Sequence, residues 1–297
     1  MGEKGLDSTG FTPGNRYTGR TLKFSGSLTS RLSILFFIGF LVMCPGVLAH
    51  MPNAPESPVV DLGSITILDG GEAVEIDLDD VAEYHGIMTN SDPDACICCI
   101  CTFRAAKAGL GELFGDEIPE RSDIGITSYL PSPGSVHTAM LISGTGPKLN
   151  CDDQGQFQVF CLNGTEIEDL SNPSLKSASA DRSIDNYHLI FTRLSTGDSV
   201  EISVSDEMFP EDFFDLRKKV KVGMSATDDE MNLFSSEWSD TRNKFLESED
   251  WEIFNEIGEP EGESEEEPEE EPDVIGGAAF LTFLICMLVV FTVFARR

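Results

Sequence analysis

The chain has 297 residues, of which 52 are Asp or Glu and 20 are Lys or Arg, so its formal net charge at pH 7 is −32. Such an acidic composition excludes binding to nucleic acid, which depends on Lys and Arg neutralising phosphates, and disfavours docking on anionic lipid. The length between the terminal segments suits one domain of ordinary size. The sequence indicates no particular protein partner and is compatible with a homo-oligomer.

An apolar run without charged residues extends over residues 275–294, from Ile275 to Phe294, and Arg296 and Arg297 follow it. About 20 such residues cross a bilayer as a helix, and flanking Arg residues stay on the cytoplasmic side. We therefore expect a transmembrane helix with a cytoplasmic tail at 295–297, or alternatively a sorting tail that is removed after export. Residues 258–274 are rich in Glu and Pro, which predicts an extended acidic stalk.

The N-terminal residues 1–49 resemble an export signal. A leader in which basic residues outnumber acidic ones precedes an apolar stretch at 32–49, which ends with small residues around Ala49. We expect a signal peptide, or alternatively an uncleaved signal anchor. Both alternatives place residues 50–257 outside the cytoplasm, so we expect a single-pass protein of the cell membrane whose domain faces outward.

Between the two termini, hydrophobic periodicity and turn residues predict one α+β domain of mixed helices and antiparallel hairpins. Strands are expected at 65–76, where a turn is included, and at 123–129, 156–162, 187–194 and 199–204. Helices are expected at 78–85, 97–114, 135–143 and 210–220, and after a Thr227/Glu230 capping box as far as about Leu246. The Ser-Thr-Gly-Asp turn between the last two strands predicts a hairpin.

Eight cysteines are present. Two lie in the expected leader and anchor, and the others are Cys96, Cys98, Cys99, Cys101, Cys151 and Cys161. Outside the cytoplasm cysteines usually form disulfides, so a bond between Cys151 and Cys161, or from either to the dense cluster at 96–101, is one interpretation. Buried apolar packing of free thiols is a second interpretation, and metal binding is a third.

Metal binding follows from the spacing within this cluster. On a helix Cys98 and Cys101 share one face, as do Cys96 and Cys99, and thiolates suit soft or borderline ions such as Zn²⁺. We predict a zinc site formed by His85, Cys96, Cys98 and Cys101. His137 or water is a candidate for a remaining position, although a histidine on an apolar helix face is more often a core residue.

The order of several motifs resembles the E-subunit family of formylmethanofuran dehydrogenase over residues 75–248. The motifs are Tyr84-His85-Gly86, the cysteine cluster, Arg104-Ala105-Ala106, VHTAMLISG at 136–144, FTRLSTGDSVEI at 191–202 and PEDFFDLRKKV at 210–220. The resemblance implies a metal, often zinc, and it carries ligands over to His85 and Cys96 only. The family pattern is interrupted by an insertion within 87–95, and a C-terminal zinc ribbon is replaced by the stalk and anchor.

These patterns favour a binding module over an enzyme. No nucleophile turn with a Ser/His/Asp order and no phosphate-binding glycine loop is present in the sequence, so we assign no catalytic or cofactor-binding residues. We expect an outward-facing, zinc-binding domain that does not itself oxidise formylmethanofuran. The alternatives are a thiol or metal redox protein at the cell surface and a structural envelope protein with a degenerate metal site.

Overall fold

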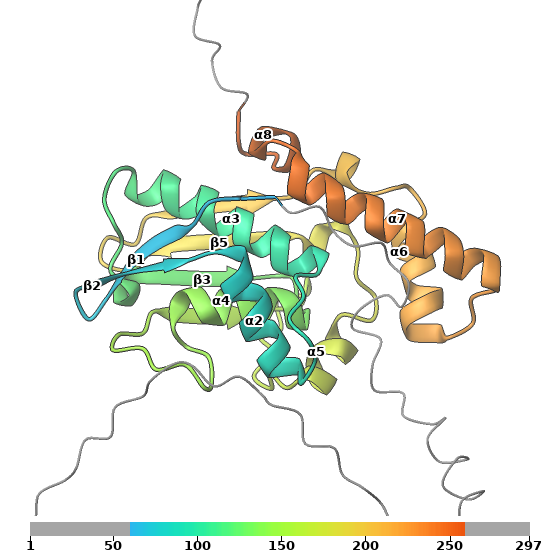
Figure 1. Cartoon of the computed structure of the whole chain (residues 1–297), viewed down its shortest axis with the longest axis horizontal. Helices are drawn as coiled ribbons and strands as arrows, with labels where there is room; N and C mark the ends of the chain where they lie inside the picture. The colour runs from blue at the N-terminus through green and yellow to red at the C-terminus, as the bar shows by residue number, and fades with distance from the viewer. Residues whose placement is uncertain (1–59, 259–297) are drawn as a thin grey trace, which may run out of the picture. The chain divides into compact units, whose positions relative to one another are not determined.

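The computed structural model describes residues 60–258 (Figure 1). The expected signal segment 1–49, the expected transmembrane helix 275–294 and all but the first residue of the expected stalk 258–274 lie outside the described residues. Within residues 60–258, no helix combines the length and the apolar character needed to cross a membrane.

The described part begins with a hairpin of β1 (Ile65–Asp69) and β2 (Glu72–Ile76). Gly70 and Gly71 form its turn with φ angles of 61° and 85°, a backbone conformation that two-residue hairpin turns require and that glycine adopts without strain. Ile65 and Ile67 are buried, as expected for alternate residues of a strand with one face on the core. The strand and turn predicted at 65–76 are confirmed.

A mixed four-stranded sheet forms the centre of the fold, with strand order β4-β3-β5-β6. Its strands are β3 (Ile124–Ser128), β4 (Gln156–Val159), β5 (His188–Arg193) and β6 (Ser199–Ser203). The β5–β6 hairpin is antiparallel as predicted, and β5 is also antiparallel to β3. The β3–β4 pair is parallel, which requires a crossover connection between these two strands. The α+β class is confirmed, and this parallel pair adds to the expected hairpins.

The long helix α3 (Ile97–Phe114) lies across the sheet (Figure 1), and its first ten residues are all buried. It packs on β5 and β6 and against the helices α2 (Leu78–Thr89), α4 (Pro133–Ser143) and α7 (Asp228–Glu247). The bounds of α3 agree with the prediction, and Gly115, with φ of 56°, ends it. The burial of its first ten residues on every side agrees with this number of packed neighbours.

The other helices show where local patterns fail. The helix predicted at 210–220 is wrong at both ends: α6 spans only Phe213–Arg217 and continues as a π-helical segment, η4 (Lys218–Gly223). In η4 Val220 packs against the core and Lys221 is half-buried. The short helices α5 (Asn172–Ala178) and α8 (Asp250–Ile253) were not predicted. The Thr227/Glu230 capping box at the start of α7 is confirmed.

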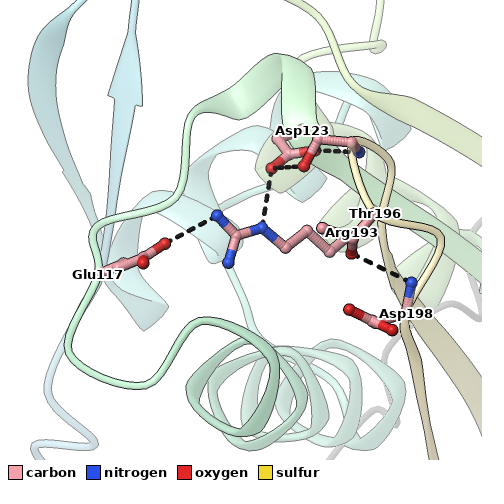
Figure 2. Close-up of polar contacts among 6 residues, drawn as sticks. Glu117, Asp123, Arg193, Thr196 and Asp198 are labelled. Carbon is pink, nitrogen blue, oxygen red and sulfur yellow. Dashed lines mark hydrogen bonds and ion pairs between the residues drawn. The ribbon is translucent and has the colours of Figure 1, made fainter.

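The turn of the β5–β6 hairpin is held by an ionic network at the C-terminal end of α3 (Figure 2). Arg193 lies 2.8 Å from Glu117 and 3.3 Å from Asp123, and its guanidinium lies over the ring of Phe114. Asp123 also accepts hydrogen bonds from the backbone N–H and the hydroxyl of Ser195 at 2.5 and 2.9 Å. The network therefore ties the hairpin turn to the segment that leads into β3.

The close approach of α3 to the sheet generates a stability prediction. A Cβ added at Gly109 would collide with the ring of Phe191 on β5, whereas a Cβ at Gly111 on the same helix meets no atom within 4 Å. We expect Gly109→Ala to lower the free energy of unfolding by about 1–3 kcal/mol through overpacking. We expect Gly111→Ala to raise it by about 0.5–1 kcal/mol, because alanine is the better helix former. Urea unfolding of both variants tests this, and equal effects would contradict it.

Candidate metal centre

Three segments bring potential metal ligands together in the part of the chain that the structure describes. His85 comes from α2, Cys96 from the residue that precedes α3, and Cys99 from the first turn of α3. One ligand atom from each side chain lies within 4.8 Å of the ligand atoms of the other two. His85 and Cys99 are buried, and Cys96 is half-buried.

His85 is positioned by the geometry of α2. A capping box between Asp77 and Asp80 starts the helix, and Asn90 in the left-handed conformation ends it. The helix thus extends past the predicted end at 85, so His85 lies within its last turns. Residues 91–95 lead the chain back to the start of α3. Arg242 of α7 pairs with Asp94 at 2.7 Å and anchors this return.

The two cysteines of the group occupy the N-cap and N3 positions of α3. These are the positions whose side chains meet in a capping box, and the two sulfur atoms lie 3.6 Å apart. Two thiolates bound to one tetrahedral Zn²⁺, with Zn–S bonds of about 2.3 Å, are separated by about 3.8 Å. The observed spacing of the sulfurs therefore needs little change to bind the ion.

Gly134 on α4 allows this arrangement. A Cβ at Gly134 would lie 2.6 Å from the sulfur of Cys96 and 3.0 Å from that of Cys99, closer than Cβ contacts normally are. Any larger residue would push the sulfurs aside. The start of α4 is fixed next to them by Pro133 in its first turn and by the Ser132 side chain, which accepts a hydrogen bond from the Ser135 N–H.

His137, one turn after Gly134, reaches the same place from α4. Its Nδ1 lies 2.9 Å from Nδ1 of His85, and one of these nitrogens must donate while the other accepts. His137 is 1 % exposed, and its Nε2 has no hydrogen-bond partner among the described residues. An unsatisfied buried nitrogen of this kind costs about 1–3 kcal/mol, so its burial needs an explanation.

Ionisation of the group is suppressed by its surroundings. Burial lowers the pKa of His137 to about 3, with the neighbouring His85 adding to the effect, and burial also lowers the pKa of His85. A hydrogen bond from Cys98 lowers the pKa of Cys96, but its bond with Cys99 and its burial outweigh this and raise the pKa to about 12. Neutral imidazole is the form that binds metals, whereas the thiols must lose protons when a metal binds.

The predicted ligands Cys98 and Cys101 lie outside this group. The sulfur of Cys98 lies 2.9 Å from Nη1 of Arg182 and 3.8 Å from the Tyr187 hydroxyl. Cys101 is fully buried in the apolar core, and this burial raises its pKa well above the usual value. The geometry therefore favours Cys99 in place of both. The N-cap and N3 positions of Cys96 and Cys99 are the sequence signal that identifies the pair.

The structure also bears on the other interpretations of the cysteines in residues 60–258. All the cysteines described there, including Cys151 and Cys161, are free thiols. The disulfides that were one alternative are therefore not formed in this structure. Cys98, Cys99 and Cys101 all belong to the main apolar core, and Cys96 packs against it.

Comparisons of the chain with protein-family models, with curated proteins and with solved structures gave no significant match. The resemblance to the dehydrogenase subunit therefore stays a prediction from the sequence. The case for the metal centre depends on its geometry.

The lowered pKa of His137 predicts a pH dependence for the protein without metal. A histidine in the unfolded chain titrates near pH 6.5, so between that value and the folded pKa of about 3 the unfolded state binds more protons. This contribution to stability is fully present above about pH 6.5 and is lost as the pH falls. We expect the free energy of unfolding to drop between pH 7.5 and 5 by about 1–2 kcal/mol more in the wild type than in His137→Gln. Equal drops in urea titrations would contradict the assignment.

Proposed function

We propose that the domain binds one transition-metal ion, zinc in the first instance, through His85, Cys96 and Cys99. The observation that carries the proposal is the convergence of these three ligand atoms within 4.8 Å at a largely buried position. Two sulfurs and an imidazole form a donor set that suits Zn²⁺ or Cu⁺, whereas Mg²⁺ and Ca²⁺ prefer oxygen ligands.

The fourth coordination position of the proposed ion can be filled by His137 or left open. His137 is in contact with His85 and has an unsatisfied Nε2, so a movement of its ring toward the group would supply a fourth protein ligand and close the site. A structural zinc site has four protein ligands, whereas a site with three leaves one position for water or another ligand. The role we propose for the domain is binding, and no residue is assigned to a catalytic step.

The cellular setting of the proposal comes from the sequence. We propose that residues 275–294 anchor the chain in the cell membrane and that the metal-binding domain faces outward. We further propose a distant relationship to the E-subunit family of formylmethanofuran dehydrogenase, for which the ordered motifs between 75 and 248 are the support. An exported domain would be separated from a cytoplasmic dehydrogenase, so we do not propose that it acts as a subunit of that enzyme.

Metal content is the decisive measurement. We expect the purified full-length chain to contain about one zinc or copper ion per molecule by mass spectrometry, and the double variant Cys96→Ser, Cys99→Ser to contain none. Cys161→Ser is the matched control, because Cys161 is a free, half-buried thiol that is not part of the group.

Cys101→Ser distinguishes the two sets of ligands. If Cys99 is the ligand, this variant keeps its metal as long as circular dichroism shows a native fold; loss of metal would restore the set predicted from the sequence. A wild type without metal, in which Cys96 and Cys99 instead form a disulfide under mild oxidation, would support the redox alternative.

The contact at Gly134 gives an independent test of the same centre. We expect Gly134→Ala to weaken metal affinity by about tenfold or more, because the new methyl group must displace one of the two sulfurs. Gly111→Ala, also on a helix but with open space around it, should leave affinity unchanged. Competition with a zinc-binding dye measures both, and unchanged affinity in Gly134→Ala would show that the ion lies elsewhere.

A further inference from the structure

Three basic side chains gather beside the cysteine cluster. Arg182, which follows α5, donates from Nη1 to the sulfur of Cys98 at 2.9 Å and to the Tyr187 hydroxyl at 3.3 Å. Arg217 of α6 donates to the carbonyl of residue 180, two positions before Arg182. Lys221 of η4 is close enough to Arg182 and Arg217 for their charges to lower its pKa. All three side chains are half-buried.

No carboxylate balances the two arginines. Among residues 60–258, neither Arg182 nor Arg217 lies within 4.0 Å of an acidic group, and the buried Nε of Arg182 has no hydrogen-bond partner. Asp181, which precedes Arg182 in the sequence, instead forms an ion pair with Lys218 at 2.6 Å, and both of these side chains are exposed. In a chain with a net charge of −32, two neighbouring arginines without acidic partners are an exception.

This clustering is unfavourable for the protein alone. Burial lowers the pKa of Arg217 to about 10, and the charge of Arg182 adds to the effect. Burial also lowers the pKa of Lys221 to about 8, where the nearby thiols oppose the effect and the two arginines reinforce it. The side chains still carry positive charge at neutral pH. Partly buried like charges are stabilised when an opposite charge joins them.

The proposed metal does not supply that opposite charge. A Zn²⁺ ion held by two thiolates and a neutral imidazole has no net charge. Ionisation of Cys98 would balance only one of the two arginines. An excess of positive charge therefore remains next to the metal group.

We propose that Arg182 and Arg217 form an anion subsite that binds the carboxylate or phosphate group of a small ligand. The planar fork of arginine matches both groups, and Arg182 has a donor left over for such a contact. Contact between Arg182 and Cys98, which lies between Cys96 and Cys99 in the sequence, places the anion beside the metal group. Only this placement depends on the proposed metal function, because the cations themselves require no metal.

Calorimetric titration of the full-length chain at constant ionic strength tests the subsite, with inorganic phosphate and malonate as separate probes. We expect saturable binding of at least one probe, and the stronger of the two identifies the chemistry. Arg217→Gln should weaken binding by about tenfold or more, since it removes a charged donor. Lys218→Gln is the matched control, because it removes the adjacent positive charge, which already has Asp181 as its partner, and should change binding by less than about twofold.

The outcomes separate the subsite from the metal proposal. Absence of saturable binding by the wild type, or equal losses in Arg217→Gln and Lys218→Gln, would overturn the subsite whether or not the protein contains metal. Phosphate or malonate binding that persists in the metal-free variant Cys96→Ser, Cys99→Ser supports the subsite alone. If Arg182→Gln does not fold, Arg217→Gln still decides the question, since its side chain makes a single backbone hydrogen bond.

Discussion

The contact between the start of α4 and the first turn of α3 is the constraint on which the candidate centre depends. Without a side chain at Gly134, the two helices approach closely enough for the sulfurs of Cys96 and Cys99 to lie against the α4 backbone. Gly134 and His137 are three residues apart and so share a face of α4. The approach that accommodates the sulfurs therefore also brings His137 to His85.

The two ends of α3 have opposite electrostatic character. At the N-terminal end, burial keeps the histidines neutral and the thiols protonated, and among residues 60–258 the neighbouring Arg182 and Arg217 have no acidic partners. At the C-terminal end, Arg193 is matched by two carboxylates and holds a hairpin turn (Figure 2). The charges at the C-terminal end of the helix are thus paired within the protein, whereas the N-terminal end is where we propose that ligands bind.

Much of the fold could be predicted because apolar patterns and turn residues in the sequence indicate the same helices and strands that tertiary packing stabilises. α3 was located correctly because a predominantly apolar segment ends at Gly115, and the β5–β6 hairpin followed from its turn residues. The parallel pairing of β3 with β4 was not predicted, since it joins segments separated by a helix and a loop. The change from α6 to η4 was missed because a π turn has no simple periodic signature.

The candidate site was predicted only in part, because its ligands are selected by tertiary packing as well as by sequence spacing. Sequence spacing shows that Cys96 and Cys99 share one face of the helix and that Cys98 and Cys101 share another. Spacing alone does not show which of these two faces is directed toward His85. Tertiary packing decides this by directing Cys101 into the core. The role of Arg182 and Arg217 was not visible at all, because two residues far apart in the sequence become a cluster only through the packing of α6 against the rest of the domain.

The closeness in sequence of His85, Cys96 and Cys99 has a consequence for the order of events when a metal binds. Bringing the ends of a short segment together costs little chain entropy, so α2 and the start of α3 could hold an ion before the sheet is assembled. This corner belongs to the main apolar core, which extends through the sheet and α7. Release of the proposed ion would then loosen the α2–α3 end of that core first, whereas the contacts within the sheet do not depend on the ion.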